Sequence, residues 1–224
     1  MKIATMQSHI VAVPPPHIGG MYWIFVTLQT TCGIKGVGEV YASTFHPEVM
    51  VKVLDDVFDR YLKGHDPHHI ERFYRECYSS GFTQRPDLTM MGAFSGLEMA
   101  CWDIIGKAAG KPVYELIGGK VHDKLRSYTY LYPTNGKGEY DYECPDLAVE
   151  CALKNMQQGF TALKFDPAGP YSAYSGHQIS LATLERSETF CRKIRDAVGN
   201  NCDLLFGTHG QMTPASAIRL AQRI

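Results

Sequence analysis

Residues 159–167 read Gly-Phe-Thr-Ala-Leu-Lys-Phe-Asp-Pro, a short apolar run that ends in two charged side chains and a proline. Lys164 and Asp166 are two positions apart, and in a β-strand this spacing places both side chains on the same face. Pro167 ends the strand, so the two charges lie together at its carboxyl end. Open α/β sheets and α/β barrels carry their chemistry there. The stretch predicts a functional pair, with a solvated pair at the start of a loop as the alternative.

The chain around this strand alternates between strands and helices. Strands are predicted at residues 125–131, 161–166 and 202–207, and helices at 145–158, 184–198 and 213–224. This β-α-β-α-β-α order is that of a parallel sheet or barrel. The middle strand lacks a long polar alternation, as expected for a strand that is covered on both faces.

The first half of the chain has a different order, three strands and then three helices. Strands at residues 2–13, 22–30 and 35–41 predict an antiparallel meander. Gly33, Gly36 and Gly38 lie between two of these strands, and no helix follows directly, so they favour a hairpin with close backbone packing over a phosphate-binding loop. Helices are predicted from Pro47 to Lys63, from Asp66 to Tyr78 and from Thr89 to Ala109, with a short turn at 112–119. This order predicts an α+β unit.

The predicted helices carry three local signals. Asp66 followed by Pro67 is the predicted start of the second helix, and His65, His68 and His69 beside it favour an exposed helix start over a metal site. The predicted inner face of the first helix is Val49, Val53, Val57 and Tyr61. The third helix has small residues for close packing at Gly92, Ala93, Ser95, Gly96, Ala100 and Ala108.

Composition excludes several classes of protein. The 224 residues are 45% hydrophobic, which is enough for a substantial core, and the formal net charge of −1 gives no basic field for nucleic acid. No apolar run has the length of a membrane span. Polar residues at 7–9 interrupt the amino-terminal apolar run, so no signal peptide is predicted and the expected location is cytoplasmic. Seven scattered cysteines without a Cys-x-x-Cys pair argue against a disulfide framework and a zinc site.

Residues 93–119 carry a family resemblance. They read Ala-Phe-Ser-Gly-Leu-Glu-Met-Ala-Cys-Trp-Asp-Ile-Ile-Gly-Lys-Ala-Ala-Gly-Lys-Pro-Val-Tyr-Glu-Leu-Ile-Gly-Gly. This segment resembles the signature of the mandelate racemase and muconate lactonizing branch of the enolase superfamily. Gly36-Val-Gly-Glu39 and Leu62-Lys-Gly-His-Asp-Pro67 resemble two further segments of the family in the same order, so the likeness covers nearly the whole chain.

The resemblance implies two domains with the site between them. Residues 1–124 would form an α+β capping domain, and residues 125–224 would begin a modified TIM-type α/β barrel. A TIM barrel needs eight strand–helix units and roughly 250 residues, whereas three units are predicted here. The barrel is therefore expected to be incomplete in this chain, as in an amino-terminal portion of a longer enzyme.

The resemblance also implies one chemical step. A Mg²⁺ ion holds the carboxylate of a small-molecule substrate while a base removes the proton α to it, because the resulting enolate needs concentrated positive charge. An acid-sugar dehydratase then expels a β-hydroxyl from an aldonate or aldarate, and a related racemase does not. A homo-oligomer is implied as well.

Candidate catalytic residues follow from the family's motifs. The Lys-x-Lys motif of the second barrel strand falls on Lys164-Phe-Asp166, which retains only the first lysine. Lys164 is a candidate base or cation. Asp166 is a candidate catalytic residue that orients Lys164 or a sugar hydroxyl, and a base in place of the missing lysine is the weaker alternative for it. The Asp-x-His motif of the third strand falls on Gly207-Thr-His209, so His209 is a candidate acid or base, with capping of the next helix near Thr213 as the alternative. Gly207 replaces the metal-binding aspartate, so the metal ligands stay unidentified and are expected beyond Ile224.

Candidate substrate-binding residues lie in the loop from Pro14 to Trp23. By the same resemblance this loop covers the barrel mouth, where His17, Tyr22 and Trp23 could reach a sugar. Core packing is the alternative for Trp23, because it also fits an inward strand position.

Two other functions remain open. A non-catalytic relative that acts as a scaffold or oligomer partner is favoured by Gly207 and by the short barrel, and it predicts no Mg²⁺ binding and no α-proton exchange. A Schiff-base enzyme that uses Lys164, as an aldolase would, predicts that borohydride traps a carbonyl substrate on that lysine.

Overall fold

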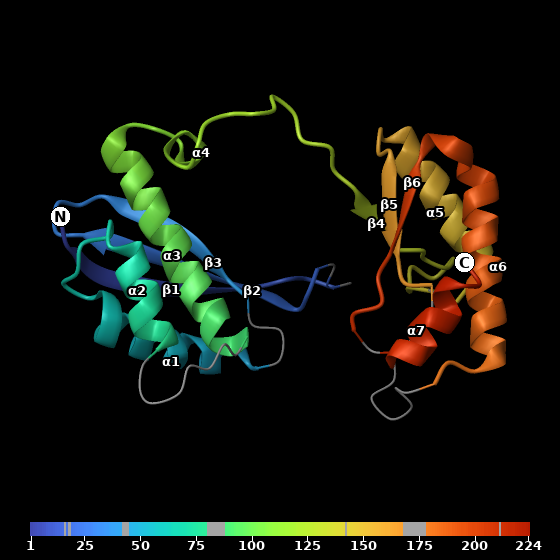
Figure 1. The fold of residues 1–224 in the computed structure, drawn as a ribbon, viewed down its shortest axis with the longest axis horizontal. Helices are drawn as coiled ribbons and strands as arrows, with labels where there is room; N and C mark the ends of the chain where they lie inside the picture. Colours follow the sequence, from blue (N-terminus) through green and yellow to red (C-terminus); the bar gives the residue numbers. More distant parts are fainter. Residues whose placement is uncertain are drawn as a thin grey trace. The chain divides into compact units, whose positions relative to one another are not determined.

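The computed structural model describes residues 1–15, 17, 19–41, 45–79, 88–141, 143–167, 178–210 and 212–224. They form two compact units, Met1–Asp123 and Lys124–Ile224 (Figure 1). Among the helices in these ranges, none combines the length and the apolar character needed to cross a bilayer.

The first unit begins with the predicted antiparallel meander. Its strands are β1 (Ile3–Ala12), β2 (Tyr22–Thr30) and β3 (Lys35–Val40), which pair in the order β1-β2-β3. Every second residue of β2 is buried, and Ile24, Val26 and Leu28 are at most 1% exposed. This alternation is typical of a sheet with one covered face.

Helices cover that face. They are α1 (Pro47–Val57), α2 (Ile70–Tyr78) and α3 (Leu88–Ala109), and a π-helical turn at Phe58–Leu62 continues α1. The short α4 (Val113–Leu116) follows α3 and has no buried residue. Figure 1 shows α3 running across the sheet. Side chains from the sheet and from α1, α2 and α3 form one hydrophobic core.

The buried face of α1 agrees only in part with the predicted one, because Val57 is buried and Val53 and Tyr61 pack against the core, but Val49 does not. Met50, Leu54 and Val57 are fully buried, whereas Val49 is 47% exposed. Residues 49 and 50 are adjacent around the helix, and both faces are apolar, so periodicity alone does not decide between them. The longer Met and Leu side chains bury more apolar area against the sheet, which favours the observed face.

Glycines bring α3 close to β3. A Cβ on Gly38 would lie 2.8 Å from the carbonyl carbon of Gly96 and would overlap its oxygen. A Cβ on Gly36 would likewise overlap the carbonyl oxygen of Ala100. Gly36 and Gly38 therefore serve backbone packing, as predicted, and Gly96 and Ala100 of α3 face them, whereas a Cβ on Gly33 would meet nothing within 4 Å. Among the small residues predicted to pack closely, Ser95 and Ala108 are exposed.

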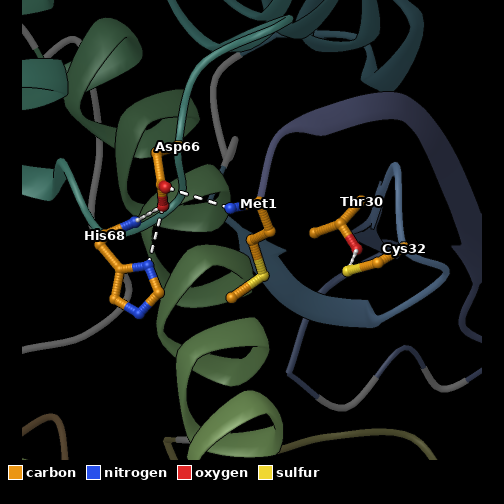
Figure 2. Close-up of polar contacts among 5 residues, drawn as sticks. All are labelled: Met1, Thr30, Cys32, Asp66 and His68. Atoms are coloured by element: carbon orange, nitrogen blue, oxygen red, sulfur yellow. Dashed lines mark hydrogen bonds and ion pairs between the residues drawn. The ribbon is translucent and has the colours of Figure 1, made fainter.

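Asp66 does not begin α2, contrary to the prediction. The helix begins at Ile70, and His69 occupies the N-cap position. Asp66 instead accepts hydrogen bonds from the backbone N–H of His68 at 3.1 Å, from its ring at 2.8 Å and from the amino group of Met1 at 3.3 Å. Figure 2 shows the three groups around the carboxylate. These bonds, above all the one from the His68 backbone, hold the pKa of the Asp66 carboxyl well below its usual range. The proline after Asp66 thus marks a turn and not the first helical residue.

The second unit contains a three-stranded parallel sheet. Its strands are β4 (Thr129–Tyr130), β5 (Ala162–Phe165) and β6 (Asp203–Phe206), in the order β4-β5-β6. The helices are α5 (Pro145–Gln157), α6 (Leu181–Val198) and α7 (Pro214–Ala221), with a 3₁₀ turn at Gly199–Asn201. The predicted alternation of strands and helices is confirmed.

One strand and one helix of this unit are markedly shorter than predicted. The strand predicted at 125–131 is reduced to Thr129–Tyr130, and the helix predicted to reach Ile224 ends at Ala221. Leu125 is 81% exposed, so no burial holds the first residues of that segment in the sheet.

Helices α5 and α6 cover one face of this sheet. Leu163 and Phe165 of β5 are buried in a core with residues of both helices, including Ala152 and Ile194. Successive strand residues point to opposite faces, so Lys164 lies on the other face of β5.

Candidate functional site

Lys164 stands near the carboxyl end of β5, on the face away from α5 and α6. Tyr130 pairs with it across the β4–β5 ladder. The Lys164 Nζ lies 5.8 Å from the ring centroid of Tyr130 and 5.9 Å from that of Tyr128. At these distances the aromatic faces attract the ammonium group. The two tyrosines therefore position a cation at this end of the sheet.

Asp166 and His209 meet at the same end. The backbone N–H of Gly207 donates to the carbonyl of Phe165 at 2.9 Å, which extends the β5–β6 pairing and brings the two strand ends together. The Asp166 Oδ2 lies 3.1 Å from the His209 Nε2, and the two side chains are 21% and 51% exposed. The contact combines a carboxylate and an imidazole that solvent can reach, which is a suitable arrangement for proton transfer.

The backbone of His209 has an unusual conformation. Its φ is +48°, in the left-handed region that non-glycine residues adopt infrequently. Such a backbone costs of order 1–3 kcal/mol and is found mainly where surrounding contacts hold it. The hydrogen bond to Asp166 is one such contact.

His209 does not cap the following helix, so that alternative is wrong. The side chain of Thr213 is the cap of α7, because it accepts a hydrogen bond from the backbone N–H of Ser216 at 3.3 Å. The side chain of His209 instead contacts Asp166 near the end of β6.

The space beside Asp166 exists because residue 207 is glycine. A Cβ on Gly207 would overlap the Asp166 Oδ1 and would lie 3.2 Å from the Lys164 Cε. The same Oδ1 is buried and finds no hydrogen-bond donor in the described part of the chain. A buried oxygen without a hydrogen bond costs about 1–3 kcal/mol. The Asp166 Oδ1 is therefore an acceptor to which a bound ligand could donate a hydrogen bond.

The residues present do not fit a Mg²⁺ ion. Magnesium is held by carboxylates together with water and substrate oxygens. Among the described residues of this cluster, Asp166 supplies one carboxylate, whose Oδ2 contacts His209, and Gly207 supplies no side chain. Among the residues that the structure describes, no group of three or more His, Cys, Asp or Glu side chains is placed to hold a metal ion.

The predicted substrate residues belong to the first unit. The His17 Nδ1 lies 2.7 Å from the carbonyl of Val13, and its φ is +59°. The hydroxyl of Tyr22 donates to the carbonyl of Phe45. Two other residues of this predicted loop, Pro16 and Ile18, lie outside the described residues.

Trp23 is not a core residue. It is 38% exposed on β2, so the core-packing alternative is wrong. Together with Tyr22, Glu39 and Tyr41 it lines a hollow of about 500 Å³ on the first unit. The hollow is large enough for a small organic acid, and it combines aromatic surfaces with one carboxylate.

Tyr128 and Tyr130 were not among the residues predicted from the sequence. Tyr130 is the last residue of β4 and Tyr128 directly precedes that strand, so the two tyrosines occupy alternate positions, which places both rings on one face. That alternation was visible in the sequence, but their proximity to Lys164 depends on the pairing of β4 with β5.

The chain matches known proteins over its whole length. Residues 11–118 match the family described as mandelate racemase / muconate lactonizing enzyme, N-terminal domain. The D-gluconate dehydratase of Thermoproteus tenax is 33% identical over 204 residues, which cover 90% of this chain and 38% of the relative. The D-galactonate dehydratase of Verminephrobacter eiseniae is 29% identical over 224 residues, which cover 100% of this chain and 52% of the relative.

Solved structures give closer matches. One from Burkholderia SAR-1, named for the same family, is 70% identical with a TM-score of 0.96, over 100% of this chain and 55% of that one. The mandelate racemase/muconate lactonizing enzyme of Jannaschia sp. CCS1 is 52% identical with a TM-score of 0.93, over 100% of this chain and 58% of that one. The chain spans about half the length of the curated relatives it matches.

The family model covers the end of β1, the strands β2 and β3 and the helices of the first unit, and the structural matches extend through the parallel sheet that carries Lys164, Asp166 and His209. The chain belongs to the mandelate racemase and muconate lactonizing enzyme family of the enolase superfamily, and its first unit is the capping domain of that family.

Proposed function

We propose that the protein is a sugar acid dehydratase, which removes the proton α to the substrate carboxylate and expels the β-hydroxyl as water. The observation that carries this proposal is the contact of His209 with Asp166 at the strand end where Lys164 also stands. The relatives named as D-gluconate and D-galactonate dehydratases support an aldonate as the substrate.

Lys164 and His209 have separate roles in this reaction. Lys164 would place a positive charge near the substrate carboxylate, where negative charge grows as the α C–H bond breaks. His209 would exchange a proton with the substrate, either by accepting the α-proton or by protonating the departing hydroxyl. The C–H electrons form the enol double bond, the C–O electrons leave with the hydroxyl, and the enol then becomes a 2-keto acid.

The proposal includes the wider arrangement expected for the family. The parallel sheet of the second unit would be the start of a TIM-type barrel, and His17, Tyr22 and Trp23 would contact the substrate from the capping domain. A Mg²⁺ requirement would need oxygen ligands other than those of the described residues. A homo-oligomer in the cytoplasm is also proposed, which sedimentation analysis and cell fractionation would test.

The experiment begins with the intact mass of the purified protein, which decides whether the 25.0 kDa chain or a longer product is assayed. Aldonates and aldarates are then screened for 2-keto acid formation, with added Mg²⁺ and with a chelator. Lys164→Met and His209→Asn should each lower kcat by about 10²-fold or more, and asparagine tolerates the left-handed backbone at position 209. The matched controls Lys154→Met and His122→Asn change exposed residues and should keep the wild-type rate.

The outcomes separate the three functions. A wild-type rate in either variant removes that residue from the mechanism. Absence of both turnover and α-proton exchange in deuterium oxide would favour the scaffold function. Borohydride trapping of a carbonyl substrate on Lys164 would favour the Schiff-base enzyme.

A further inference from the structure

The carboxylate of Asp166 occupies the space that a side chain at position 207 would need. A Cβ there would overlap the Asp166 Oδ1 and lie 3.4 Å from its Cγ. The other oxygen, Oδ2, is the atom that contacts the His209 Nε2. Any substitution at Gly207 must therefore rotate the carboxylate that holds His209.

This contact determines where the neutral ring of His209 carries its proton. An ionised carboxylate can only accept a hydrogen bond, so the Nε2 must be the donor. The lone pair of the neutral ring then lies on Nδ1, which becomes the basic nitrogen. Asp166 thus selects one tautomer and one orientation of the ring.

We propose that Gly207 is a positioning residue: its missing side chain lets the Asp166 carboxylate hold His209 as the Nε2–H tautomer. This inference rests on the proposed function for its catalytic use of His209, but the placement itself can be tested without turnover. Asp166 acts through His209 and is a positioning residue in the same sense.

The test compares Gly207→Ala with Asp166→Asn in protein that carries ¹⁵N-labelled histidine. A proton held between Nε2 and a carboxylate exchanges slowly and gives a ring N–H signal, which is assigned by its loss in His209→Asn. We expect Gly207→Ala and Asp166→Asn each to lose this signal. The control Gly136→Ala should keep it, because a Cβ on Gly136 meets nothing within 4 Å.

A second measurement covers the case in which the added methyl group affects folding. Gly207→Ala should lower the thermal midpoint, because the Cβ collides with Asp166. In an Asp166→Ala background the same change should lower it much less, since the colliding atom is gone. An equal loss in both backgrounds, or a retained ring N–H signal in Gly207→Ala, overturns the inference.

Kinetics separate this inference from the proposed function. If His209 is the acid or base, Gly207→Ala and Asp166→Asn should each lower kcat by about 10²-fold, with KM within about threefold, as expected for a misplaced catalytic group. If no sugar acid is turned over but the ring signal responds as expected, the dehydratase function fails and the placement of His209 by Gly207 and Asp166 is supported.

Discussion

Gly38→Ala tests the close packing of β3 against α3 in the capping domain. Gly38 lies on β3 and faces α3, where an added Cβ would be 2.8 Å from the carbonyl carbon of Gly96 and 3.1 Å from the backbone nitrogen of Ala100. Both neighbours are backbone atoms of a long helix, so neither can move aside as the end of a flexible side chain can. The substitution must push the helix away from the sheet.

The expected cost follows from two opposing terms. Burial of one more methyl group would contribute about 0.8 kcal/mol if there were room for it. Overpacking typically costs about 1–3 kcal/mol, and a collision with helix backbone belongs at the upper end of that range. We expect the free energy of unfolding to fall by about 3 kcal/mol, which lowers the thermal midpoint of a unit of this size by roughly 10 °C.

Tryptophan fluorescence is the suitable assay. The chain has two tryptophans, Trp23 and Trp102, and both lie in the first unit. Their emission during urea or thermal unfolding therefore follows the capping domain and not the second unit. The control is Val37→Ala on the opposite face of the same strand, where the side chain is 49% exposed and the expected change is below about 1 kcal/mol.

A change of the unfolding midpoint in Gly38→Ala that is no larger than the change in Val37→Ala would refute this account of the packing. Such a result would mean that α3 can move away from β3 without loss. Close packing would then not explain the two glycines of the hairpin.

The remaining predictions concern ionisable groups. Burial raises the pKa of the Cys77, Cys101 and Cys191 thiols from 9.0 to about 12. As the pH rises, these thiols lose their protons in the unfolded chain before they lose them in the folded chain, so the free energy of unfolding should fall between pH 9 and 12 by about 1.4 kcal/mol per pH unit for each thiol. Urea titrations at several pH values would measure this fall. The hydrogen bond with Thr30 lowers the pKa of the exposed Cys32 thiol (Figure 2), so a disulfide reagent should modify Cys32 first, and more slowly in Thr30→Val. Below pH 4 the Asp66 carboxyl stays ionised in the folded chain, whereas in the unfolded chain it binds a proton, so the free energy of unfolding decreases as the pH falls. In acid unfolding curves, Asp66→Asn should make this decrease between pH 4 and 2 smaller.

Local patterns were sufficient for most of the secondary structure. The antiparallel meander, the long helix α3 and the alternating second half were predicted because side-chain periods and breaker residues act over a few positions. Errors occurred where local signals were ambiguous. The sequence Asp66-Pro67 has the form of a helix start, but the Asp66 carboxylate is used by His68 and Met1 instead.

The site was predicted only in part, and for a related reason. Lys164 and Asp166 could be placed on one face from their spacing alone, and His209 was singled out through a motif. Which groups these side chains contact was not predictable, because partners such as Tyr130 and Gly207 come from other strands.

The sequence by itself determined the order of strands and helices, the family, and the shared face of Lys164 and Asp166, because each depends on residues that are close along the chain. Only the tertiary structure decided that Asp166 meets His209, which is 43 residues away, and that Gly207 provides the space for this contact. The physical reason is that parallel strands are joined through helices, so neighbours across the sheet are set by strand pairing and core packing over the whole unit.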